Sequence, residues 1–120
     1  PIQYALYYPE RRFLAGERLD FWSIGHLDFE KPDMDTFKCL SLAYRAIKTG
    51  GTLPTVMNGA NEIAVSAFLE NKIGFLDIAD IIEKTMDSYT VKYDYTVEDL
   101  VDADKWARKF SDNLIKTKEN

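Results

Sequence analysis

The most informative stretch of this chain is residues 58–69, which read NGANEIAVSAFL. It places two amides and a carboxylate, those of Asn58, Asn61 and Glu62, at the start of an otherwise apolar segment. A segment that is apolar on nearly every side predicts a helix buried among its neighbours. Polar groups beside a buried helix cost free energy unless they are paired. The three side chains are therefore expected to cap the helix, to hold a neighbouring segment or to contact a ligand.

Two interpretations of these three candidate residues follow. If Asn58 is the N-cap of a helix over residues 58–71, its side-chain oxygen accepts a backbone N–H of the first turn. Glu62 then lies near the positive end of the helix dipole. The favoured interpretation is a capped core helix whose amides hold an adjacent loop. The alternative is an inter-domain or ligand contact through Asn58, Asn61 or Glu62.

The remaining patterns predict a mainly α fold, with a small bundle of about four helices. Apolar residues recur at three- and four-residue steps from residue 35 until Gly50 and Gly51 end the helix. A further helix is expected after Gly74, and a last one after the capping signal TVED at residues 96–99. The apolar residues of the first of these patterns are Phe37, Leu40, Tyr44 and Ile47.

The first 32 residues have a different pattern. Residues 1–8 predict a short helix, because proline suits the first helical position and Pro9 stops the run. Residues 19–29 are strand-like, since apolar residues alternate with Asp20 and Asp28. An isolated hairpin is marginal in water, so these residues call for a sheet that the rest of the chain does not offer. Because the chain begins with Pro1 and not with methionine, we expect a piece of a longer protein.

Composition narrows the possible partners. The 120 residues suit one domain, and the net charge of −5 argues against a nucleic-acid partner. No apolar run approaches the roughly 20 residues needed to span a bilayer. A single cysteine and a single histidine rule out an internal disulfide and a zinc site built from such residues. A reducing, cytoplasmic setting is the simplest interpretation.

Three other chemical features receive structural interpretations. Cys39 falls within an apolar helical pattern and is expected to be buried filler. His26 has no serine or cysteine at a suggestive spacing. Four carboxylates surround Pro32 but lack the glycine and terminal glutamate of a calcium loop, so a solvated linker is expected. These carboxylates are Asp28, Glu30, Asp33 and Asp35.

Three groups of segments, in this order and spacing, resemble one enzyme family. The first group is YPER at residues 8–11 with LDF at 19–21. The second is LDF at 27–29 with PD at 32–33 and CL at 39–40, and the third is NGANEIAV at 58–65 with AFL at 67–69. Together they resemble the carboxy-terminal part of 1-deoxy-D-xylulose 5-phosphate reductoisomerase. The Asn-x-Ala-Asn-Glu segment is the most specific, and the resemblance covers essentially the whole chain.

The resemblance implies a three-part parent enzyme, a homodimer that makes 2-C-methyl-D-erythritol 4-phosphate in non-mevalonate isoprenoid synthesis. An amino-terminal domain would bind NADPH, and a central domain would hold a divalent metal (Mg, Mn or Co) and the substrate phosphate. Residues 1–32 would end that central catalytic and dimerisation domain, and residues 33–120 would form the carboxy-terminal bundle.

The family's metal-binding acids and phosphate-binding motif would lie upstream of Pro1. The resemblance therefore assigns no catalytic, cofactor-binding or metal-binding residue to this chain. The chain alone is expected to be structural, inactive and free of cofactors, with the rest of the same polypeptide as its partner. The alternative from another functional class is a free-standing helical protein-interaction module.

Overall fold

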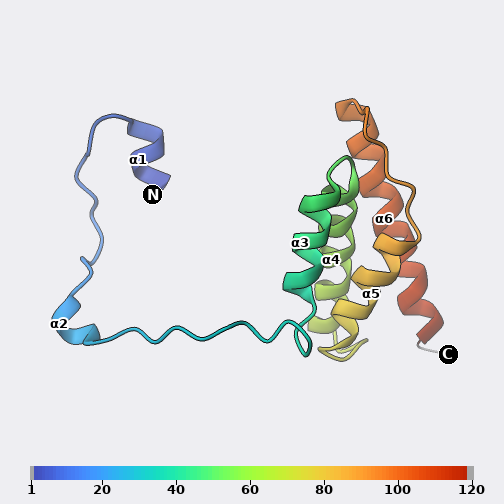
Figure 1. Cartoon of the computed structure of the whole chain (residues 1–120), viewed down its shortest axis with the longest axis horizontal. Helices are drawn as coiled ribbons and strands as arrows, with labels where there is room; N and C mark the ends of the chain where they lie inside the picture. Colours follow the sequence, from blue (N-terminus) through green and yellow to red (C-terminus); the bar gives the residue numbers. More distant parts are fainter. Residues whose placement is uncertain (1, 119–120) are drawn as a thin grey trace. The chain divides into compact units, whose positions relative to one another are not determined.

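The computed structural model describes residues 2–118, and it places six helices and no strand in them (Figure 1). Two compact units divide the chain, residues 1–31 and residues 32–120. The helices of the first unit are α1 (Ile2–Tyr7) and α2 (Phe21–Ile24). Those of the second are α3 (Cys39–Thr49), α4 (Leu53–Leu69), α5 (Asp77–Asp87) and α6 (Val97–Lys118). The mainly α fold predicted from the sequence is confirmed.

The first unit has no core of its own within residues 2–31, where no side chain is buried. The predicted short helix is present as α1, although Pro1 lies outside the described residues. The strand expected at residues 19–29 is not confirmed, because the backbone forms the helical turn α2 there. Asp20 caps this turn by accepting the N–H of Trp22 at 2.9 Å, and Gly25 ends it with a φ of 71°. A local cap satisfies backbone groups that a strand could satisfy only by pairing with a neighbour.

The second unit is the predicted four-helix bundle. Its central helix is α4, which contacts α3, α5 and α6 (Figure 1). The core consists mainly of aliphatic side chains from all four helices, among them Leu42, Val56, Ala60, Ile81, Ile82, Met86, Ala107 and Ile115. No helix within residues 2–118 is both long and apolar enough to cross a membrane.

The start of α4 differs from the prediction. The helix begins at Leu53 with Pro54 in its first turn, so Asn58 lies inside the helix and is not its N-cap. Thr52 precedes the helix, and the hydroxyl of Thr52 accepts the N–H of Lys92 at 3.1 Å. The apolar run from residue 58 therefore lies inside α4, whose buried residues already include Leu53 and Val56.

The apolar residues of α3 lie on two faces, and only one of these faces is buried. Leu42 and Ala46 face the core, whereas Phe37, Leu40, Tyr44 and Ile47 are exposed. Cys39 is exposed as well, so its prediction as buried filler is wrong. Periodicity correctly predicted a helix here, but it could not show which of the two apolar faces the bundle covers.

The two local signals that end α3 and begin α6 act as predicted. Gly50, with a φ of 70°, ends α3 and its N–H bonds the carbonyl of Ala46. Thr96 and Asp99 form a capping box, because the N–H of Asp99 bonds the Thr96 hydroxyl at 3.3 Å and the N–H of Thr96 bonds the Asp99 carboxylate at 2.8 Å. Aspartate thus serves where glutamate or glutamine is more usual.

Candidate functional site

The polar residues of the NGANE segment form a tie between α4 and α6. The Asn58 amide donates to Glu62 Oε1 at 3.0 Å, one turn further along α4. Arg108 Nη2 on α6 donates to Glu62 Oε2 at 2.5 Å, and Arg108 Nε donates to Asp104 Oδ2 at 2.7 Å. Both oxygens of the Glu62 carboxylate therefore have partners within the bundle.

The hydrogen bonds between Glu62, Arg108 and their neighbours stabilise the charged form of both side chains. The hydrogen bond from Arg108, and after it the one from Asn58, lowers the pKa of Glu62 below its usual range. Hydrogen bonds to Asp104 and to Glu62 raise the pKa of Arg108. Glu62 is thus held as a carboxylate anion, which accepts hydrogen bonds and offers no proton to a reaction.

Asn61 does not join this tie. Its side chain is half-buried on α4 and makes no side-chain hydrogen bond to any residue in the described part of the chain. The three candidates predicted from the sequence therefore separate into two groups. Asn58 and Glu62 are used by the bundle itself, and Asn61 keeps its hydrogen-bonding capacity available.

Sequence reasoning did not find the partner of Glu62. The i,i+4 spacing of Asp104 and Arg108 predicts an ion pair between these two residues, which the structure confirms. Nothing in the local pattern shows that the guanidinium also reaches a carboxylate 46 residues earlier in the chain. Only the packing of α6 on α4 brings the two groups together.

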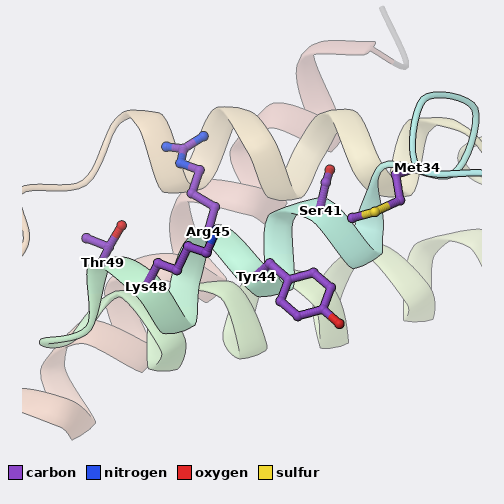
Figure 2. A pocket seen from close by; sticks show the side chains of 6 residues that line it. All are labelled: Met34, Ser41, Tyr44, Arg45, Lys48 and Thr49. Atoms are coloured by element: carbon purple, nitrogen blue, oxygen red, sulfur yellow. The ribbon is translucent and has the colours of Figure 1, made fainter. Parts of the chain in front are cut away.

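A shallow cavity of about 680 Å³ lies along α3, away from the NGANE segment in sequence (Figure 2). Two cations, two hydroxyl groups, a tyrosine and a methionine line it: Met34, Ser41, Tyr44, Arg45, Lys48 and Thr49. The Arg45 guanidinium already pairs with Asp87 on α5, and the Ser41 hydroxyl bonds the carbonyl of Lys38. The residues that line the cavity include no carboxylate and no histidine.

A divalent metal does not fit the described side chains. Within residues 2–118, no three His, Cys, Asp or Glu side chains gather closely enough to hold a metal ion. Asp33 instead accepts the backbone N–H groups of Asp35 and Thr36 at 3.1 and 3.0 Å, and these bonds lower its pKa. His26 lies 3.5 Å from Asp28, and both side chains are exposed.

Residues 2–118 contain no G-x-G-x-x-G loop of the kind that binds a dinucleotide. The Gly50-Gly51 pair before α4 is the nearest approach to a phosphate-binding turn, but a Cβ on Gly51 would lie 2.6 Å from the carbonyl oxygen of Lys92. Val91 and Lys92 therefore pack directly against Gly51. We assign no catalytic step to these residues.

The fold and the site define a class of protein module, a small helical bundle in which polar residues of α4 and α6 link two helices. Comparison with known proteins identifies the family. The model of the DXP reductoisomerase C-terminal domain matches residues 1–110, and the chain belongs to this family.

Curated relatives agree with this assignment. The 1-deoxy-D-xylulose 5-phosphate reductoisomerase of Acetivibrio thermocellus is 50% identical over 116 residues, which are 97% of this chain and 30% of the relative. The enzyme of the same name from Lachnospira eligens is 55% identical over 105 residues, 88% of this chain and 28% of the relative. The chain thus spans less than a third of the length of these relatives.

Solved structures show the same fold. The Zymomonas mobilis reductoisomerase in complex with NADPH superposes with a TM-score of 0.85 at 48% identity, over 95% of this chain and 30% of that protein. A DOX-P reductoisomerase in complex with magnesium gives a TM-score of 0.86 at 38% identity, over 99% of this chain and 32% of that protein. NADPH and magnesium are ligands of these longer proteins.

Proposed function

We propose that this chain acts as the carboxy-terminal part of a 1-deoxy-D-xylulose 5-phosphate reductoisomerase. The whole enzyme would convert its substrate to 2-C-methyl-D-erythritol 4-phosphate with NADPH and a divalent metal, as an oxidoreductase of non-mevalonate isoprenoid synthesis. The observation that carries the proposal is the similarity to the Acetivibrio thermocellus reductoisomerase. The two proteins are 50% identical over a segment that makes up 97% of this chain but only 30% of that enzyme. The metal, the cofactor and the chemistry would belong to the remaining part.

The proposed role of the chain itself is structural. Two of its three candidate side chains, those of Asn58 and Glu62, are hydrogen-bonded within the bundle. Asn61 is the one candidate residue left for a contact outside the bundle. An amide that becomes buried in an interface costs free energy if it stays unpaired, so such an interface favours a hydrogen-bond partner for it.

We also propose that residues 1–32 are the end of the central domain and that residues 33–120 are the bundle domain. Two observations support this division. The chain separates into compact units at residues 31 and 32, and the first unit leaves large apolar side chains such as Phe13, Trp22 and Phe29 in solvent. Such a segment gains stability only from a larger apolar surface that covers it. A homodimeric, cytoplasmic parent enzyme completes the proposal.

A hybrid enzyme tests the proposal. The matching segment of the Acetivibrio thermocellus reductoisomerase is replaced by this chain, and NADPH oxidation is followed with 1-deoxy-D-xylulose 5-phosphate and magnesium or manganese. We expect turnover by the hybrid, and none by the 120-residue chain or by the relative truncated before that segment. Turnover by the 120 residues alone contradicts the structural role. A folded hybrid that binds NADPH but shows no turnover contradicts the assignment to this enzyme.

A further inference from the structure

We propose that the exposed apolar face of α3 is the docking surface for the part of the reductoisomerase that this chain lacks. The α3 face consists of Leu40, Tyr44 and Ile47 on the helix and Phe37 just before it, and the inference rests on the function proposed above. It adds to that function the particular surface through which the bundle would join the rest of the enzyme.

The α3 face is apolar and open to solvent. Phe37 is 54% exposed, Leu40 41%, Tyr44 53% and Ile47 72%. Leu40, Tyr44 and Ile47 are spaced by three or four positions, so they lie on one side of the helix, opposite the buried Leu42 and Ala46. Phe37 lies just before the helix, which begins at Cys39. The Tyr44 ring projects away from the helix in Figure 2. Phe75 extends the surface beyond the start of α3, where its ring lies 6.4 Å from that of Phe37. A helix with apolar residues on two faces is expected to pack against a neighbour on each face.

The charged residues around the α3 face leave its apolar side open to a partner. The helix contains Arg45 and Lys48 but no acidic residue, in a chain of net charge −5. Arg45 is paired with Asp87 of α5, and Lys38, just before the helix, lies 3.8 Å from Asp80 and 3.6 Å from Glu83. These pairs hold α3 on α5 and leave the apolar side free. Lys48 has no ion pair with a described residue, so the geometry fits an apolar partner surface with a carboxylate at its rim.

The missing part of the same polypeptide is the occupant that these observations favour. Solved reductoisomerases superpose on 95% and 99% of this chain, yet this chain covers only 30% and 32% of them. A stable complex between separate chains buries about 1,200–2,000 Å², far more than three side chains on one eleven-residue helix and Phe37 before it supply. A covalently linked surface needs less area, because linkage gives the partner a high effective concentration.

Hydroxyl-radical footprinting of the hybrid enzyme tests the docking surface directly. The oxidation rate of Tyr44 is compared between the 120-residue chain and the hybrid, with Tyr93, which is 68% exposed, as the internal reference. We expect the Tyr44 rate to fall at least about fivefold in the hybrid, since the core of an interface is fully buried. An unchanged Tyr44 rate in an active hybrid overturns the docking surface and leaves the proposed function standing.

Two matched double variants give a second readout. Tyr44→Glu with Ile47→Glu places charges on the α3 face, and Tyr93→Glu with Val101→Glu places them at exposed sites elsewhere. We expect both pairs to leave the helicity and melting of the 120-residue chain nearly unchanged, and only the first pair to lower the melting temperature and turnover of the hybrid. Equal effects of the two pairs on the hybrid contradict the proposal. Concentration-dependent protection of Tyr44 in the 120-residue chain also contradicts it, because that result indicates a second copy as the occupant.

Discussion

Arg108 of α6 donates a hydrogen bond to the carboxylate of Glu62 on α4, with 2.5 Å between Nη2 and Oε2. The pair joins residues 46 positions apart and ties the most specific sequence motif of the chain to its last helix. Both side chains keep contact with solvent, at 36% for Arg108 and 51% for Glu62. The tie is therefore a half-exposed link between helices and not a buried charge pair.

Glu62→Gln is expected to lower the melting temperature of the chain slightly, without loss of helical content. A half-exposed ion pair contributes little, and salt screens it. Thermal melts followed by circular dichroism, at low and at high ionic strength, measure the effect. The difference between parent and variant should shrink at high salt. Glu17→Gln is the control, because Glu17 is exposed and has no ion pair with a described residue. A salt-independent loss would show that Glu62 acts through packing.

Asp99 is expected to make stability depend on pH at the acidic end. The hydrogen bond from Lys92, at 2.7 Å, and those from Thr96 lower the pKa of Asp99 from 3.8 to about 2. A group whose pKa is depressed by folding stabilises the protein above its unfolded pKa, and this contribution is lost as the pH falls through the folded pKa. The difference in melting temperature between the parent and Asp99→Asn should therefore be constant near neutral pH and fade between pH 3.8 and about 2.

A second variant isolates the cause of this pH dependence. Lys92→Met removes the largest contribution to the lowered pKa of Asp99. In the Lys92→Met protein, the pH-dependent difference in melting temperature caused by Asp99→Asn should become smaller. A profile that does not change would show that the Thr96 contacts alone hold the carboxylate ionised.

The buried hydroxyls of Thr85 and Ser111 should show non-additive energetics. They lie 2.9 Å apart, and the Thr85 hydroxyl donates to the carbonyl of Ile81 at 2.8 Å, so the Ser111 hydroxyl donates to Thr85. Thr85→Val leaves the Ser111 hydroxyl without this acceptor and is expected to cost about 1–3 kcal/mol. The double variant with Ser111→Ala should cost less than the sum of the two single variants. Urea unfolding measures all three, and additive losses would contradict the pairing.

Gly51 is expected to tolerate no side chain. Its φ is 58°, and a Cβ would lie 2.6 Å from the carbonyl oxygen of Lys92. Asn71→Ala is the matched control, because Asn71 has a φ of 59° and is exposed. Gly51→Ala should destabilise the bundle by about 1–3 kcal/mol more than the control, since forced overlap adds to the conformational strain. Equal losses in urea unfolding would show that the 90–92 loop moves aside.

Ile82 should matter more to stability than Phe68. Ile82 is fully buried, and Ile82→Ala is expected to cost about 2–5 kcal/mol. Phe68 is half-buried beside Phe75, with 5.8 Å between ring centroids, so Phe68→Ala removes contacts without opening an enclosed cavity. Urea unfolding of the two variants compares them. A larger loss at Phe68 would mean that its ring is covered in solution.

Much of the bundle could be predicted because its signals are local. Gly50 ends α3, Thr96 and Asp99 cap α6, and the spacing of Asp104 and Arg108 marks an outward ion pair, and each of these acts within a few residues. The start of α4 could not be predicted in the same way. Pro54 opens the helix, but Thr52 is held by Lys92, a residue 40 positions later.

The candidate site was predicted in part for the same reason. The pairing of Asn58 with Glu62 is an i,i+4 contact that the spacing allows, whereas the role of Arg108 depends on packing between helices. The strand-like alternation at residues 19–29 shows the opposite case. A local cap by Asp20 forms a helical turn where the pattern alone predicts a strand.

The sequence by itself determined the helical class, the C-terminal end of α3, the start of α6 and, through three groups of short motifs, the family, because caps, breakers and motifs depend on neighbouring residues. Only the tertiary structure decided which apolar face of α3 is covered and which cation pairs with Glu62. Both depend on contacts between residues far apart in the chain, and hydrophobic periodicity is the same for a covered face and an exposed one.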